Sequence, residues 1–345
     1  MDAMPPDRPR WRHLIALAPA LALLACLLAK TTSCAPCAGP FDLQRSHCLS
    51  QADGKPPSGG GVKVTFFGVS TLLFDDGKNQ VMIDGFFSRL PLKTMLAGPI
   101  STDKAAVDAA LARGGVRTVD GLFVAHSHYD HAFDVAYVAE KTGATIYGSR
   151  STDHIARGGN VPESRRKIFK AGEQYGFGKF TVTVLDGRHS PPITGINDDL
   201  GQTIDEPLGQ PADRKAYKEG GAYDFLIEHG GRSILVIPST NYRAGSLDGV
   251  KADVLFLSTA TLGIQTEKFR EDYYGNTAGR LRPELVIPIH WDNFFLPLSD
   301  ELKGLGGTSF GFLERRLRKD GIRFGILQGF QSTVLFEKPA AEAPR

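Results

Sequence analysis

After residue 61, short apolar runs alternate with amphipathic segments, a pattern that predicts a domain of strands and helices. Three β-rich runs come first, and the turn residues Gly68 and Asp76-Gly77 separate them, so an antiparallel meander is predicted. These strands cover residues 62–67, 71–74 and 80–84. An amphipathic helix over residues 101–113 follows and ends at Gly114-Gly115.

Strands and helices alternate in the rest of the chain. Residues 121–125 predict a buried strand, and residues 131–142 predict a helix that Gly143 ends. Further strands are predicted at residues 144–147, 179–185, 223–228, 233–237, 254–257 and 285–289, then a helix near 309–319 and a hairpin of 322–327 with 331–336. This order predicts an α/β (α+β) fold made of two βα halves packed face to face.

The first 25 residues have the layout of a secretory signal rather than of a folded element. Arg8, Arg10 and Arg12 precede an apolar run over residues 14–25, which is short for a transmembrane helix. The run ends in Leu-Leu-Ala-Cys at residues 23–26, which resembles the bacterial lipobox. We therefore expect a lipoprotein tethered at Cys26 on the periplasmic face of a bacterial membrane. An ordinary cleaved signal, giving a soluble periplasmic or secreted protein, and an uncleaved anchor are the alternatives.

Residues 26–61 are predicted to be the anchor segment and linker, because they are rich in Pro, Gly and Ser. All four cysteines (Cys26, Cys34, Cys37 and Cys48) lie in the first 48 residues, so no thiol nucleophile exists in the domain that follows. Cys34 and Cys37 have a CxxC spacing without a second pair, which disfavours a structural zinc site. A disulfide that includes Cys48 is expected in an oxidising compartment.

Composition and charge are those of an ordinary globular protein. The chain has 345 residues, of which 41% are hydrophobic, and 40 Lys and Arg stand against 38 Asp and Glu. Such a length can bury one large core or two small ones. Since a near-neutral balance gives little attraction for phosphate backbones, nucleic acid is not an expected partner.

One motif carries most of the chemistry. His126, His128, Asp130 and His131 lie within six residues, directly after the apolar strand at 121–125. Imidazole and carboxylate are ligands of zinc and similar divalent ions. His126 and His128 point the same way in an extended turn, while Asp130 and His131 can turn toward a second ion. Several imidazoles held so close together favour a metal site over a fortuitous polar loop.

This HxHxDH motif resembles the signature of the metallo-β-lactamase superfamily. The resemblance implies an αββα sandwich over residues 62–338, with 339–345 as a tail and a two-metal site at one edge of the two sheets. It also implies that His189 joins His126 and His128 on the first ion, and that His290 joins Asp130 and His131 on the second. Asp84, at the end of the third strand, matches an aspartate that usually orients the metal loop.

One position departs from the family pattern. The superfamily commonly has a metal-bridging aspartate where this chain has Ser239. A hydroxyl is a poorer ligand than a carboxylate, so the second ion is expected to bind more weakly, or both ions to be held by water and three protein ligands each. Ser239 and the sequence around Asp292 look more like the lactonase-like and lipid-hydrolase-like branches than the antibiotic-degrading members.

The resemblance implies an exported hydrolase that uses a metal-activated hydroxide on an ester, lactone or phosphodiester. Asp130 is both a ligand and a plausible proton acceptor, and the expected cofactor is one or two Zn²⁺, with Mn²⁺ or Fe²⁺ as alternatives. A metal-binding member that has lost turnover through Ser239 is the main rival. A di-iron oxygen reductase is less favoured, because those relatives carry a Glu where this chain has His128.

Two segments are expected to overhang the site, residues 85–100 and the long irregular stretch 191–221. The first is apolar, which suits either a small-molecule or lipid-like substrate or plain core packing. Of the remaining histidines, His154 could face the cleft or lie on the surface of a helix, and the surface is favoured. His229 is expected in a turn.

Overall fold

The computed structural model describes residues 49, 51, 57, 60–193 and 197–337. The predicted signal, the lipobox, all four cysteines and the tail after residue 338 lie outside the described residues. No helix in these described parts is both long and apolar enough to cross a membrane.

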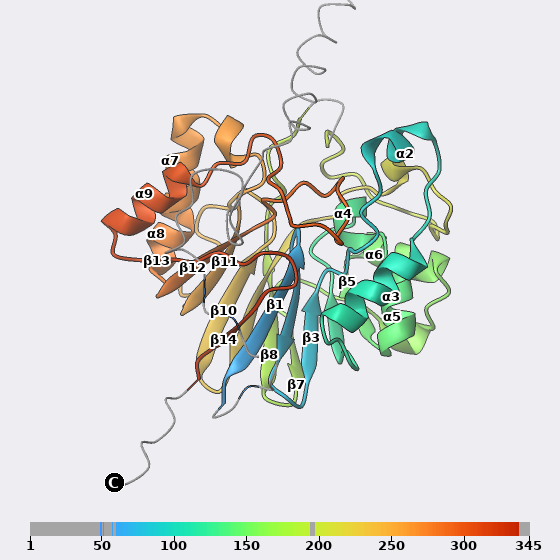
Figure 1. Cartoon of the computed structure of the whole chain (residues 1–345), viewed down its shortest axis with the longest axis horizontal. Helices are drawn as coiled ribbons and strands as arrows, with labels where there is room; N and C mark the ends of the chain where they lie inside the picture. The colour runs from blue at the N-terminus through green and yellow to red at the C-terminus, as the bar shows by residue number, and fades with distance from the viewer. Residues whose placement is uncertain (1–48, 50, 52–56, 58–59, 194–196, 338–345) are drawn as a thin grey trace, which may run out of the picture.

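Two seven-stranded sheets form the centre of the fold (Figure 1). The first has the order β14-β1-β2-β3-β4-β5-β6 and the second the order β13-β12-β11-β10-β9-β8-β7. The strands of the first sheet are β1 (Val62–Gly68), β2 (Thr71–Asp75), β3 (Gln80–Ile83), β4 (Gly121–Phe123), β5 (Thr145–Gly148), β6 (Arg166–Ile168) and β14 (Ser332–Leu335). Those of the second are β7 (Gln174–Phe177), β8 (Phe180–Asp186), β9 (Tyr223–His229), β10 (Arg232–Ile237), β11 (Val254–Ser258), β12 (Leu285–Ile289) and β13 (Arg323–Phe324).

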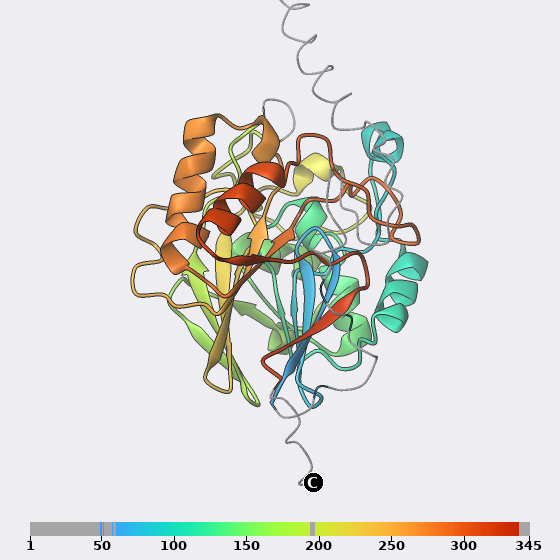
Figure 2. The ribbon, with the colours of Figure 1, turned by 60° about the vertical axis from the view of Figure 1, so that its left-hand side comes forward.

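Helices lie on the outer side of each sheet, so the layers follow the predicted αββα order (Figures 1 and 2). The α-helices are α2 (Leu92–Ala97), α3 (Lys104–Arg113), α4 (Tyr129–Ala132), α5 (Val135–Thr142), α6 (Arg150–Gly158), α7 (Glu267–Asn276), α8 (Ala278–Leu281) and α9 (Gly311–Lys319). Short 3₁₀ turns are η2 (Glu163–Arg165), η3 (Arg214–Ala216) and η4 (Leu262–Ile264). The helix predicted from residue 101 begins at Lys104 because the Asp103 side chain accepts from Ala106 N at 3.0 Å, which caps it.

The main core lies between the sheets, where aromatic rings from the two sheets meet edge to face. Phe74 on β2 lies 6.1 Å from Phe256 on β11, and Phe123 on β4 lies 5.7 Å from Phe225 on β9, between ring centres. A second apolar cluster lies between the second sheet and helices α7, α8 and α9. Each sheet packs against the other sheet on one face and against helices on the other face. This packing fixes the edges of the two sheets relative to each other.

Strand direction brings the chemistry to one edge. β3 and β4 run parallel, and β8 runs in the same direction as β10, β11 and β12 through the antiparallel strand β9. Asp84 follows β3 and His126 follows β4 in the first sheet. Because the carboxyl ends of parallel strands meet at one edge, these two residues lie at the same edge. His189 and His290 follow strand ends in the second sheet. The antiparallel meander of β1, β2 and β3 is confirmed.

The prediction of one continuous helix over residues 131–142 is wrong. The helix is divided into α4 and α5, with Asp134 between them. The Asp134 carboxylate accepts hydrogen bonds from Phe87 N and Ser88 N, both at 2.8 Å, and from Ser88 Oγ at 2.6 Å. The break allows this buried carboxylate to hold the turn that leads toward α2.

The predicted C-terminal hairpin is also wrong. β13 pairs in parallel with β12 in the second sheet, whereas β14 pairs antiparallel with β1 in the first. Each strand covers an edge that would otherwise leave backbone N–H and C=O groups unpaired, which explains why the chain crosses from one sheet to the other.

Candidate metal centre

The loop over residues 126–131 begins just beyond β4 and leads directly into α4. Asp84 Oδ1 accepts a hydrogen bond from Ala125 N at 2.8 Å, and Ser127 N donates to Glu219 O at 2.9 Å. Hydrogen bonds donated by backbone N–H groups thus fix the start of the loop. One is accepted by the Asp84 side chain at the end of β3, and the other by a carbonyl of the long 191–221 segment. His128 is the residue before α4, which explains why Asp130 and His131 turn away from it.

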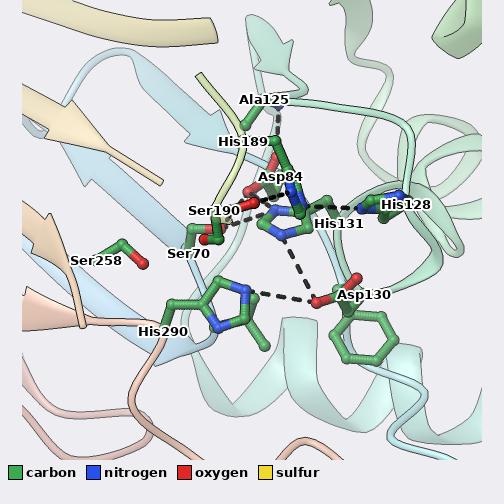
Figure 3. Close-up of polar contacts among 12 residues, drawn as sticks. Ser70, Asp84, Ala125, His128, Asp130, His131, His189, Ser190, Ser258 and His290 are labelled. Carbon is green, nitrogen blue, oxygen red and sulfur yellow. Dashed lines mark hydrogen bonds and ion pairs between the residues drawn. The ribbon is translucent and has the colours of Figure 1, made fainter. Parts of the chain in front are cut away.

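The structure brings His126, His128 and His189 into one cluster, with one nitrogen of each ring within 4.8 Å of the others. His128 Nδ1 lies 3.1 Å from His189 Nε2 (Figure 3). Their remaining nitrogens face outward: His189 Nδ1 lies 3.0 Å from Ser190 O, and His128 Nε2 lies 3.0 Å from Asp199 Oδ1. The two inward nitrogens face each other, as two ligands of one shared ion would.

A second cluster joins Asp130, His131 and His290, again with donor atoms within 4.8 Å. Asp130 Oδ2 lies 3.7 Å from His131 Nε2 and 3.4 Å from His290 Nε2 (Figure 3). The rings of His126 and His131 lie 3.8 Å apart between centres, so the two clusters adjoin each other. All six residues expected as ligands thus fall into the two groups of three that the resemblance implies.

Burial lowers the pKa values of two histidines in the first cluster. Burial first, and neighbouring histidines second, lower the pKa of His189 to about 3 and the pKa of His126 well below its usual value. Imidazoles with such pKa values are neutral near pH 7 and keep a lone pair for a cation. The donor set therefore fits a divalent ion such as zinc.

The second cluster contains charge. Burial alone would raise the pKa of Asp130, but His131 and His290 outweigh it and lower the pKa, so the carboxyl is ionised. Burial would lower the pKa of His131, yet Asp84 and Asp130 outweigh it and raise the pKa. His131 Nε2 is buried without a hydrogen-bond partner among the described residues, which suits an atom that coordinates a cation.

Side chains behind the clusters orient two of the histidines. Asp84 Oδ2 lies 2.8 Å from His131 Nδ1, and Ser70 Oγ lies 3.0 Å from the same nitrogen. Asp199 does the same for His128 from the long loop. The sequence pattern predicted this supporting role for Asp84. It did not predict it for Ser70 and Asp199, because neither lies near the motif in the chain.

Two further positions that the sequence singles out are Ser239 and Asp292. Ser239 is buried just beyond β10. The Asp292 carboxylate pairs with Arg89 Nη1 at 2.6 Å and accepts from Val69 N at 2.7 Å, so it is already engaged. Neither side chain has a hydrogen bond to a histidine of the two clusters within the described parts of the chain.

Two predictions about the remaining histidines need correction. His154, expected on the surface, is buried on α6. His229, expected in a turn, is the buried last residue of β9, with its Nε2 3.2 Å from Asp76 Oδ2. Both pack into the fold because their helix and strand are longer or more deeply covered than the local sequence suggests.

A shallow pocket adjoins the first cluster from the side of α7. Its walls are mostly apolar, and its polar lining comes from Arg188 and Asn241; the full set is Arg188, Pro191, Pro192, Leu200, Asn241, Tyr242 and Phe269. Asn241 Nδ2 donates to His189 O at 2.6 Å, which connects the pocket to the cluster.

Solved structures share this fold. YhfI from Bacillus subtilis, a metallo-β-lactamase fold protein, superposes with a TM-score of 0.51 at 16% identity, covering 80% of this chain and 100% of that one. A possible metal-dependent hydrolase from Veillonella parvula superposes with a TM-score of 0.51 at 14% identity and the same coverage. Fold and donor clusters together define a metallo-β-lactamase-fold protein with a candidate site for divalent ions.

Sequence comparisons agree with that class. The family model described as the metallo-beta-lactamase superfamily matches residues 64–235. A UPF0173 metal-dependent hydrolase from Heliobacterium modesticaldum is 26% identical over 235 residues, covering 67% of this chain and 83% of the relative. One from Staphylococcus aureus is 24% identical over 237 residues, covering 68% and 87%. The chain belongs to the metallo-β-lactamase superfamily. Its expected place near the lactonase-like and lipid-hydrolase-like branches stays a prediction.

Replacing His128 with Ala leaves two imidazoles in the first cluster. We expect the variant to lose most of its bound zinc while remaining folded, because the ring contributes a donor atom rather than core packing. Elemental analysis together with circular dichroism measures both. His154→Ala is the matched control, a buried histidine outside both clusters, and should keep its metal. Wild-type metal content in the His128 variant would contradict the assignment.

Proposed function

We propose that the protein is a metal-dependent hydrolase that acts on an ester, lactone or phosphodiester, with zinc as the preferred ion. The observation that carries the proposal is the pair of adjoining donor clusters at one edge of the sandwich. When bound there, divalent ions would lower the pKa of a water and polarise the oxygen of the bond being cleaved. The metal-dependent hydrolases among its relatives agree with this reaction class.

Asp130 is the residue we assign to proton transfer. Its side chain is 13% exposed while the His131 side chain is fully buried, so the carboxylate has access to solvent. His131 and His290 keep it ionised, and an ionised carboxylate accepts a proton. The histidines hold Asp130 in place through contacts on Oδ2 alone.

The substrate we favour carries an apolar group beside the reacting bond. The pocket next to His189 has Pro191, Leu200 and Phe269 in its walls, and Arg188 is its charged member. Phe294 also packs at the second cluster, with its ring centre 5.9 Å from that of His290. Apolar surfaces on both sides of the donor atoms suit a greasy small molecule or lipid better than a fully polar substrate.

Hydrolysis of a matched panel tests this proposal. Esters of increasing acyl length, lactones and phosphodiesters would be assayed with and without a chelator, then after zinc, manganese or iron is added back. We expect chelator-sensitive turnover that increases with acyl length. Metal binding without turnover on any member would instead support the rival, a metal-binding protein without catalysis.

Ser239 is the specific feature that favours this rival. Within the described chain, the carboxylates that contact the cluster histidines are Asp84, Asp130 and Asp199, and only Asp130 belongs to a donor cluster. Two other carboxylates could have replaced a bridging aspartate. Asp292 already pairs with Arg89, and the pKa of Asp224 is raised to about 8 by burial and then by Asp186, which favours its neutral form near pH 7. The di-iron alternative is disfavoured by His128, which takes its place in the first cluster.

Ser239→Asp should add a negative charge at the end of β10 and tighten the second ion. We expect the wild type to retain nearer one zinc than two after dialysis, and the variant to bind the second ion at least about tenfold more tightly, which is about 1.4 kcal/mol. Titration calorimetry on the metal-stripped proteins measures both sites. Two equally tight sites in the wild type, or no gain in the variant, would contradict this interpretation of Ser239.

Export as a lipoprotein completes the proposal, supported by the sequence of residues 1–26 alone. If Cys26 carries the lipid, Cys26→Ser should have one of two effects. Either the protein is released from the membrane fraction, or an uncleaved precursor accumulates. Cell fractionation with immunoblotting measures location and size together. Cys34→Ser is the matched control and should not change either. Normal processing and attachment of the Cys26 variant would instead favour another mode of export.

A further inference from the structure

A buried ion pair lies beside the second cluster. Arg89 Nη1 lies 2.6 Å from Asp292 Oδ2, and the exposed fractions of the two side chains are 1% and 0%. Arg89 also reaches Phe67 O through Nη2 at 3.4 Å and lies over the Phe86 ring at 5.4 Å from its centre. A pair removed so completely from water is weak support for stability, because desolvation offsets its attraction. The contacts of the pair with the backbone around His290 point instead to a positional role.

The pair acts on the backbone that carries His290. Asp292 Oδ1 accepts from Val69 N at 2.7 Å, and His290 N donates to Val69 O at 2.5 Å. Val69 is thus bonded on both sides to the chain at 290–292. The next residue, Ser70, contacts Asp84 at 2.5 Å and His131 at 3.0 Å. One turn between β1 and β2 therefore touches both histidines of the second cluster.

The backbone of this region is strained. Val69, Asp84, Arg89 and His290 all have positive φ, at 50°, 55°, 40° and 54°. A β-branched residue such as Val69 rarely adopts this conformation, and strain of this kind persists only when the surroundings impose it. Gly68 makes room for the pair, because a Cβ there would lie 2.0 Å from Arg89 Nη2 and 2.8 Å from Asp292 Oδ2.

We propose that Arg89 is a positioning residue for the second ion: by fixing Asp292 and, through it, the Val69 turn, it holds the His290 imidazole against Asp130. The inference rests on the proposed role of Asp130, His131 and His290 as ligands. The first cluster has supports of its own, namely Asp199 behind His128, the Ser190 carbonyl behind His189 and the long loop at Ser127. Asp84, which also holds the loop through Ala125 N, has no hydrogen bond to Arg89 or Asp292 within the described residues. Loss of Arg89 should therefore weaken one site and spare the other.

Titration of metal-stripped protein with zinc tests this directly. Arg89→Met keeps the length of the side chain but leaves Asp292 unpaired. We expect the affinity of the second site to fall about 10- to 100-fold, the range for supporting partners of metal ligands, while the first site changes less than about twofold. Arg89→Lys, which keeps the charge, should recover most of the loss.

Arg117→Met is the matched control. Arg117 pairs with the buried Asp75 at 2.9 Å, at the end of β2 rather than beside His290. It should lower thermal stability without changing the ratio of the two affinities. If Arg89→Met does not fold, Asp292→Asn replaces it, since the amide oxygen still accepts from Val69 N while the charge is lost.

Three outcomes would overturn the inference. Equal weakening of both sites would indicate a general structural role for Arg89. A fall in melting temperature with both affinities unchanged would do the same. A wild type that binds only one zinc, even at saturating concentrations, would remove the second site itself and so contradict the proposed ligand set as well.

Discussion

Five imidazole rings meet at one edge of the two sheets, and the close packing of these buried rings is the constraint on which the site depends. His126, His128 and His189 have ring centres within 5 Å of one another, and His131 lies as close to His126. Burial and the neighbouring rings oppose protonation of His126 and His189, while a divalent cation shared among the lone pairs satisfies several rings together. The rest of the fold holds these rings in contact with one another.

Both sheets contribute to that restraint. β4 supplies the loop with four of the six cluster residues, and the second sheet adds His189 beyond β8 and His290 beyond β12. Because the main core packs the sheets against each other, the rings cannot separate without disrupting aromatic contacts such as Phe74 with Phe256. The core therefore holds the donor atoms in place, which reduces the ordering that ion binding must supply.

Much of the fold and site could be predicted because their signals are local. A few consecutive residues are enough to recognise the HxHxDH motif and the strand before it. The same holds for the histidines after β8 and β12. The errors involve distant partners: β13 and β14 join different sheets, Asp199 lies 71 residues from His128, and Asp292 lies 203 residues from Arg89. Helix α2, within the segment predicted as an overhanging loop, is another element that local patterns missed. No local pattern specifies which distant carboxylate a histidine or arginine will find.

The distribution of carboxylates suggests how the site functions without an aspartate at position 239. Asp199 lies behind His128 in the first cluster, and Asp84 lies behind His131 in the second, at 3.0 and 2.8 Å from the outward nitrogens. A carboxylate behind an imidazole makes the ring a more basic ligand and adds negative charge near the ion without occupying a coordination position. Each cluster thus receives one such carboxylate, and only Asp130 offers charge directly. Ser239 stands in the sequence where the superfamily commonly has a bridging carboxylate, so the two ions would depend on separate sets of ligands rather than on a shared one.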